Sequence, residues 1–168
     1  MIYFEAAKRI QELTEVKWHK LTPVLFGNAV EWTLGTEYIL ASIFVPNETG
    51  LLVFRTECYS TNTTSGAADF LSRKTTPPGE AWWMTGDDLT VTSDNRNDQT
   101  DRANDAHIVL DVDNWLLFGP GQFAFLVGAL DAILDARIVR TSCYGFFVPS
   151  EIYEQFRNQF QQISGGLV

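Results

Sequence analysis

Histidine and cysteine are scarce in this sequence, with two of each among 168 residues. His19 and His107 stand apart, and neither has the neighbours of a spaced metal-ligand cluster, so a histidine-based metal site is not expected. Cys58 and Cys143 are too few for a disulfide scaffold and lack CxxC spacing. We expect each cysteine to act as a small apolar residue in a strand, and the sequence leaves open a single disulfide between them.

Positive charge is also scarce, with 12 Lys and Arg against 21 Asp and Glu and a net charge of −9. No basic stripe marks a nucleic-acid or membrane-surface site, so we expect neither sequence-specific nucleic-acid binding nor a membrane partner. The apolar stretch 115–134 contains Pro120, Gln122 and Asp131, which disfavours a transmembrane helix. The first residues lack a basic leader followed by an apolar run. A cytoplasmic location is therefore the default expectation.

Enzyme motifs are missing from the sequence, which contains no glycine-rich phosphate loop, nucleophile elbow or HExxH. Two carboxylate pairs, Asp111 with Asp113 and Asp131 with Asp135, each fall on one predicted element. A glycosidase needs its two carboxylates on opposite sides of a substrate cleft, which this spacing does not provide. We therefore predict no enzymatic activity and no cofactor.

Aromatic residues are abundant, with 12 Phe, 5 Tyr and 5 Trp, and hydrophobic residues make up 45% of the chain. This composition and length predict one domain over residues 1–168 with a substantial core. Trp82 and Trp83 are adjacent, and either indole could stack on a sugar. Neighbouring residues of a strand point to opposite faces, so at most one of the two would reach a given ligand.

The negative charge is concentrated between residues 80 and 114, where nine acidic residues face two basic ones and the net charge is −7. The polar stretch 94–106 has no apolar periodicity and is predicted to be a loop. Its oxygen-bearing side chains suit calcium, but the EF-hand order fails, and a solvated acidic loop is the favoured interpretation. The acidic set that we single out is Asp87, Asp88, Asp94, Asp98, Asp101 and Asp105.

Periodicity and turn residues predict an α+β fold with a mainly antiparallel sheet. An amphipathic helix is expected over 2–14 and a hairpin with arms 37–45 and 51–59. Strands are expected over 107–118 and 138–148. After Gly119-Pro120, apolar residues at intervals of four predict a helix over 120–136. Pro149-Ser150 precedes an apolar stripe that predicts a closing helix over 151–163.

Two features of the predicted elements indicate contacts between subunits. The hairpin arms are apolar on both faces at their centres, so both faces must be covered. Small residues at intervals of four along the predicted 120–136 helix would let another backbone approach closely. The predicted oligomer-interface residues are Ile43, Phe44, Phe54, Ala124, Gly128 and Ala132.

This order of elements resembles that of small structural proteins of tailed bacteriophages, of the tail-terminator or head-to-tail connector type. The resemblance covers most of the chain but includes no diagnostic motif, so no functional residue is carried over. It implies a non-enzymatic homo-oligomer, such as a ring, that contacts other virion structural proteins and is assembled in the host cytoplasm. The alternative is a carbohydrate- or calcium-binding module that uses Trp82 or Trp83 and the Asp-rich loop 94–105.

Overall fold

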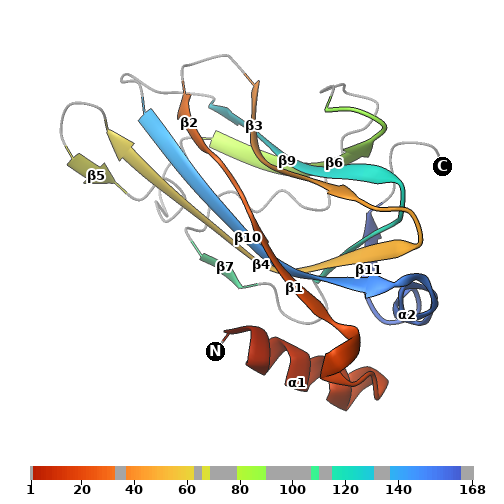
Figure 1. Ribbon diagram of the computed structural model, residues 1–168. Coiled ribbons are helices and arrows are strands. Elements are labelled where there is room, and N and C mark those ends of the chain that lie inside the picture. Colours follow the sequence, from red (N-terminus) through yellow and green to blue (C-terminus); the bar gives the residue numbers. More distant parts are fainter. Residues whose placement is uncertain are drawn as a thin grey trace.

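Two β-sheets packed face to face form the body of the protein in the computed structural model (Figure 1). The structure describes residues 2–32, 37–62, 66–68, 79–89, 107–109, 115–130 and 137–163. The larger sheet has the order β1 (Thr22–Phe26), β10 (Arg137–Pro149), β4 (Thr49–Asn62), β8 (Leu116–Phe118) and β11 (Gln161–Ile163). In addition β2 (Ala29–Trp32) pairs with β10, while β5 (Gly66–Ala68) and β7 (His107–Val109) pair with β4. The smaller sheet has the order β3 (Glu37–Val45), β9 (Gln122–Leu130) and β6 (Gly79–Gly86).

The helices lie at the periphery of the two sheets. Helix α1 (Ile2–Thr14) crosses the outer face of the larger sheet, followed by the short 3-10 helix η1 (Trp18–Lys20) (Figure 1). Helix α2 (Ser150–Phe156) follows β10 directly. Among the described strand pairs, only β8 with β11 is parallel, and the other pairs are antiparallel. The predicted α+β class with a mainly antiparallel sheet is confirmed.

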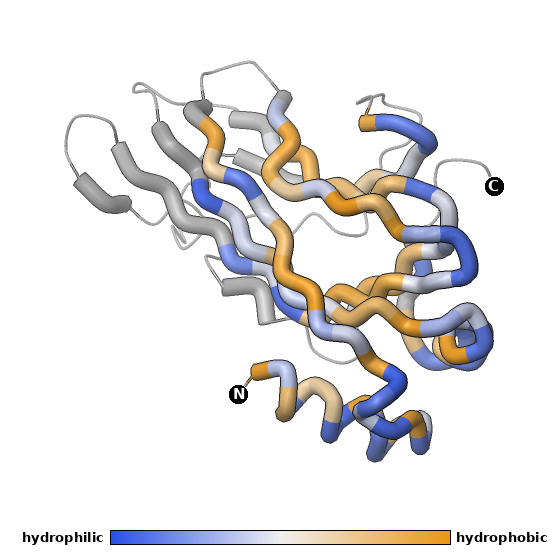
Figure 2. The backbone as a smooth tube through the Cα atoms, viewed as in Figure 1, coloured by the Kyte–Doolittle hydropathy of each residue, from blue (hydrophilic) through white to orange (hydrophobic). Residues whose placement is uncertain are grey.

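The core between the sheets is built from alternate residues of facing strands. The Trp83 ring on β6 lies 6.3 Å from Phe26 of β1 and 5.2 Å from Phe118 of β8. Trp83 therefore connects the smaller sheet to two strands of the larger one. Hydrophobic segments of the described strands gather where the two sheets meet, whereas hydrophilic residues lie at turns, on α1 and at separate positions along the strands (Figure 2).

A second apolar cluster lies on the other face of the smaller sheet. Met84, Phe125 and Val127 are fully buried there, on the side of the strands opposite to Trp83 and Leu126. The strand β9 is thus buried on both faces, which is why its sequence is apolar without a clear alternation.

The predicted helix over 120–136 is wrong for residues 122–130, which form β9. A spacing of four residues fits one face of a helix, but it also fits one face of a strand, because four is a multiple of two. Ala124 and Gly128 therefore share a strand face, and both are buried. Pro120 lies in a turn, and Gly121 adopts a φ of 77°. Residues 131–136 lie outside the described part of the chain.

The arms predicted as a hairpin are strands, but they do not pair with each other. Strand β3 pairs with β9, whereas β4 pairs with β10 and β8. The turn at residues 46–48 therefore carries the chain from one sheet to the other, with Glu48 at a φ of 61°. The two-sided burial that the sequence predicted is present near the start of β4, where Leu51, Leu52, Val53 and Phe54 are all buried.

The closing helix is shorter than predicted, because α2 ends at Phe156 instead of residue 163. Ile152, Phe156 and Phe160 of the predicted stripe are buried. After the turn at 157–159 the chain runs alongside β8 as β11. Pairing with β8 gives the backbone of residues 161–163 hydrogen-bond partners and replaces the last turns of the helix.

Candidate functional site

Large apolar side chains are exposed mainly near the N-terminus of the described chain. Phe4 is 66% exposed, Trp18 is 72% exposed and Leu25 is 62% exposed, while Phe44 on β3 is 46% exposed. Single exposed apolar residues are common on protein surfaces. An apolar cluster around a hollow is less common and marks a contact or ligand site.

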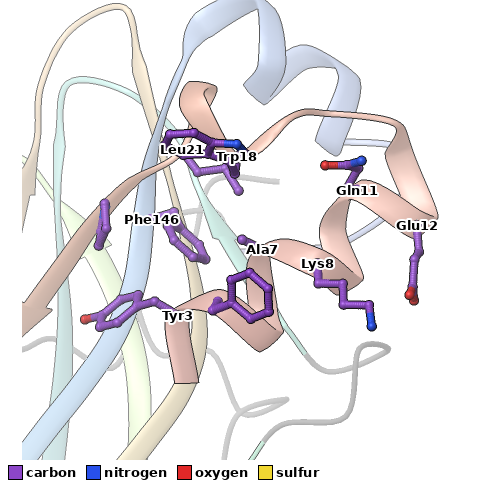
Figure 3. Close-up of a pocket in the computed structure, with 10 residues that line it drawn as sticks. Tyr3, Ala7, Lys8, Gln11, Glu12, Trp18, Leu21 and Phe146 are labelled. Carbon is purple, nitrogen blue, oxygen red and sulfur yellow. The ribbon is translucent and has the colours of Figure 1, made fainter. Parts of the chain in front are cut away.

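Phe4 and Trp18 flank a groove of about 750 Å³. The groove lies between α1 on one side and η1 with the start of β1 on the other (Figure 3). Phe146 lies at its base, and Lys8, Gln11 and Glu12 extend along its outer side (Figure 3). The residues that line it are Tyr3, Phe4, Ala7, Lys8, Gln11, Glu12, Trp18, Leu21, Pro23 and Phe146.

The helical period of α1 produces the groove. Residues 3, 7 and 11 form one row along the helix and residues 4, 8 and 12 the next. Ala7 leaves a hollow in the first row because its side chain is short. Ala6, Ile10 and Thr14 form a third row, which is buried and holds the helix on the sheet.

The C-terminal end of α1 is fixed by polar contacts. The Thr14 hydroxyl donates to the carbonyl oxygen of Ile10 at 2.7 Å. The Gln155 side chain on α2 donates to the carbonyl oxygen of Thr14 at 3.0 Å. Glu15 follows with a φ of 64°, a left-handed conformation that commonly ends a helix. These contacts place η1, and with it Trp18, beside the groove.

Tyr3 fixes the other end of α1. Its ring meets Phe54 at 5.4 Å and Phe146 at 5.5 Å, both edge to face. Its hydroxyl donates to the carbonyl oxygen of Val24 on β1 at 2.6 Å. Burial, and to a lesser degree Tyr144, raises the pKa of Tyr3 above its ordinary value of 10.0. The neutral hydroxyl is therefore the form that the fold stabilises.

We expect Tyr3→Phe to lower the free energy of unfolding by about 1 kcal/mol at neutral pH, because the hydrogen bond to Val24 is lost. Since the folded-state pKa is raised, the contribution of Tyr3 is complete below pH 10.0 and is lost as the pH rises through the folded-state value. Urea unfolding at neutral pH and above pH 10 should therefore show a smaller alkaline loss for Tyr3→Phe than for the wild type. Tyr153→Phe should also reduce the alkaline loss, because burial raises the pKa of Tyr153 as well. An equal alkaline loss in Tyr3→Phe and the wild type would contradict the role of Tyr3.

The surroundings of the groove carry more positive charge than the chain as a whole. Residues 1–20 include Lys8, Arg9, Lys17 and Lys20 against three acidic residues, a net charge of +1, whereas the whole chain has −9. Arg9 pairs with Glu12 at 3.3 Å, and Lys20 approaches Glu151 at 4.0 Å.

The predicted interface residues do not form one surface. Ile43 and Ala124 are paired across β3 and β9 and contribute to the main core. Phe54 is 3% exposed and packs inside the chain, and Gly128 is buried. Phe44 alone among the described members of the set is exposed, and Ala132 lies outside the described residues.

Only part of the predicted acidic and ligand-binding set can be placed. Asp87 and Asp88 are exposed and follow β6 directly. The other acidic residues of the set lie outside the described residues; they are Asp94, Asp98, Asp101 and Asp105. The predicted calcium site in loop 94–105 falls on the same residues.

Trp83 is 3% exposed in the core and cannot stack on a sugar, and the side chain of Trp82 is not among those described. Within the described ranges, no three His, Cys, Asp or Glu side chains form a potential metal site.

Comparison with known proteins finds no matching family model, curated protein or solved structure. Among the helices of the described residues, none combines the length and the hydropathy required to span a membrane.

Proposed function

We propose that this protein is a non-enzymatic assembly protein that forms a homo-oligomer and uses the α1 groove as a contact surface. The observation that carries the proposal is the exposure of Phe4 and Trp18, at 66% and 72%, on either side of an apolar groove of about 750 Å³. Among its lining residues the groove has a single carboxylate, that of Glu12, and no His, Cys, Ser or Asp.

The energetics favour a macromolecular partner for this surface. Burying a large apolar side chain such as Phe contributes about 1.5–3 kcal/mol, and aromatic residues are enriched at the buried centres of interfaces. Residues of this kind commonly dominate binding energy when they fill a pocket on the partner. A partner that covers both Phe4 and Trp18 removes the largest exposed apolar surface near the N-terminus of the described chain.

The narrower form of the proposal is a virion component of the tail-terminator, connector or neck type, with other virion structural proteins as further partners. It is supported by the net charge of −9. The order of elements does not add to this support, because residues 122–130 form a strand and the arms 37–45 and 51–59 do not pair with each other. Negative charge near a DNA passage keeps the phosphate backbone from adhering to the wall of the channel.

The proposal is tested by the mass of the purified full chain over a range of concentrations. We expect native mass spectrometry and light scattering to show species larger than the 18.9 kDa monomer. Phe4→Ser combined with Trp18→Ser should weaken association at least about 30-fold, because a hot-spot residue contributes about 2 kcal/mol or more.

The matched control is Glu5→Ser combined with His19→Ser, since these residues are exposed on the same two helices but do not line the groove. The control variant should retain the wild-type mass. A wild-type protein that stays monomeric at every concentration, or a groove variant that assembles normally, would overturn the proposal.

A further inference from the structure

The occupant of the groove can be inferred from a second exposed aromatic residue on the opposite side of the molecule. Phe44 is 46% exposed near the end of β3, and its ring meets Phe123 of β9 edge to face at 5.2 Å. In the sheet register Phe44 pairs with Phe123, and Phe123 pairs with Gly86 at the end of β6. Asp87 and Asp88, both exposed, follow in the chain. We call Phe44, Phe123, Asp87 and Asp88 the acidic edge.

The acidic edge and the groove complement each other in charge. Lys8 lines the groove together with Glu12, whose charge is compensated by Arg9 at 3.3 Å. Lys17 precedes Trp18, and the segment 1–20 has a net charge of +1. The acidic edge belongs to the described segment 79–89, which has three acidic residues and no basic one. Opposite potentials on two surfaces favour their encounter and fix their relative orientation.

The groove is also large enough to accept an aromatic side chain. Pockets for small-molecule ligands have volumes of about 300–1,000 Å³, and the groove, at about 750 Å³, falls in this range. The exposed Phe44 ring can therefore enter between Phe4 and Trp18, with Asp87 left at the more polar margin near Lys8.

The two surfaces lie on opposite faces of the sandwich, so one subunit can use both at once. Helix α1 covers the outer face of the larger sheet (Figure 1). Phe44 is the cross-strand partner of Phe123, so both lie on the same face of the smaller sheet. This is the outer face, because Phe123 packs against the second apolar cluster. A contact between different surfaces of identical subunits is heterologous and continues from subunit to subunit until a ring closes or a filament forms.

We propose that the groove of one subunit binds the acidic edge of a second copy of the same chain, with the Phe44 ring inserted and the carboxylate of Asp87 facing Lys8. This inference rests on the proposed homo-oligomer and specifies its contact. It predicts a head-to-tail arrangement instead of a symmetric pairing of groove with groove.

The decisive experiment mixes two variants of the full chain that each lack one surface. Trp18→Ser removes the groove contact and keeps the acidic edge, whereas Phe44→Ser does the reverse. Each variant alone should stay monomeric at concentrations where the wild type assembles. An equimolar mixture, with one variant labelled by nitrogen-15, should yield a dimer that contains one copy of each variant and grows no further, which native mass spectrometry resolves by mass.

A charge exchange gives an independent readout that does not depend on removing an aromatic ring. Lys8→Glu should weaken assembly about two- to fivefold, as expected for one exposed ion pair. Adding Asp87→Lys to the same chain should restore assembly, because the pair is then re-formed between subunits with its signs reversed. Circular dichroism and urea unfolding verify that each variant is folded.

The outcomes separate this inference from the proposed function. If Phe44→Ser assembles like the wild type while Trp18→Ser does not, the groove is a contact surface but its occupant is not the acidic edge. If Phe44→Ser alone forms symmetric dimers, the groove binds a second groove, and the head-to-tail contact is excluded. A wild-type protein that never assembles overturns both proposals.

Discussion

Gly27→Ala should destabilise the protein by about 3 kcal/mol or more, at the upper end of the range for overpacking. A Cβ atom at position 27 would lie 1.8 Å from the carbonyl oxygen of Thr141 and 2.7 Å from its carbonyl carbon. Both contacts are with backbone, so no change of side-chain rotamer relieves them. Gly27 lies between β1 and β2, which pair with successive parts of β10.

The backbone around Gly27 has little freedom to move away. The amide of Thr141 donates to the carbonyl oxygen of Asn28 at 2.9 Å, and the amide of Asn28 donates to Leu40 of the smaller sheet at 3.0 Å. A shift of residue 27 would break these bonds, which join strands of both sheets. Strand β10 has neighbours on both sides, with β1 and β2 on one side and β4 on the other. It therefore cannot move away from residue 27 without losing its own strand pairing.

Urea unfolding followed by circular dichroism measures the effect, with protein refolded from urea if the variant accumulates in insoluble form. Asn28→Ala is the control, because its side chain is exposed and its backbone hydrogen bonds are kept. The control should unfold within about 0.5 kcal/mol of the wild type. A Gly27→Ala protein with the wild-type unfolding midpoint would show that the approach of residue 27 to β10 is not as close as described.

The second large effect is expected for Phe118→Ala, at about 3–5 kcal/mol for the loss of a buried phenyl ring. Phe118 is fully buried, and its ring lies 5.2 Å from that of Trp83 in the opposite sheet. It is also paired with Leu51 of β4. Truncation leaves a cavity between the sheets that neither strand can close without losing its own pairing.

Phe44→Ala is the matched control for Phe118→Ala, since it removes the same ring from a strand position that is 46% exposed. Its cost should be about 1 kcal/mol, the value of the edge-to-face contact with Phe123. Both variants are compared by urea unfolding in dilute solution, where association does not contribute to stability. Equal losses in the two variants would contradict the assignment of Phe118 to the core.

Local signals in the sequence were sufficient for several elements. The amphipathic period over 2–14 matches α1 (Ile2–Thr14), and the apolar run over 37–45 matches β3 (Glu37–Val45). The strand predicted over 138–148 corresponds to β10 (Arg137–Pro149). In each case the turn residues and the hydrophobic period of the segment indicate the same kind of element, and the folded protein contains that element.

The errors arose where pairing over long sequence distances decides the structure. Residues 122–130 are apolar on both faces because one sheet of the sandwich has a cluster on each side, and such a run can be a buried helix or a buried strand. The turn at 46–48 looked like a hairpin, but its two arms find their partners in β9 and β10. The residues next to these segments do not determine whether 122–130 is a helix or a strand, or which strands the two arms pair with.

The groove was not predicted, for a similar reason. Trp18 lies between Lys17 and His19, and Phe4 lies on the amphipathic segment 2–14, so neither residue is marked in the sequence as part of an exposed apolar surface. The hollow between them depends on Phe146, which reaches them only through the pairing of β10 with β1. The abundance of aromatic residues was the available signal, and it did not indicate which of them remain exposed.

The position of β10 in the larger sheet has a consequence for how the chain folds. Strands β1, β2 and β4 all pair with β10, although the ribosome synthesises them long before residues 137–149. Their β10-facing edges have no partner until that strand emerges, so the sheet closes late in synthesis. Folding dominated by such distant pairing is slow, in the range of milliseconds to seconds for small domains. During this interval the open edges invite pairing with other chains, so yield on expression should depend on temperature and on chaperones.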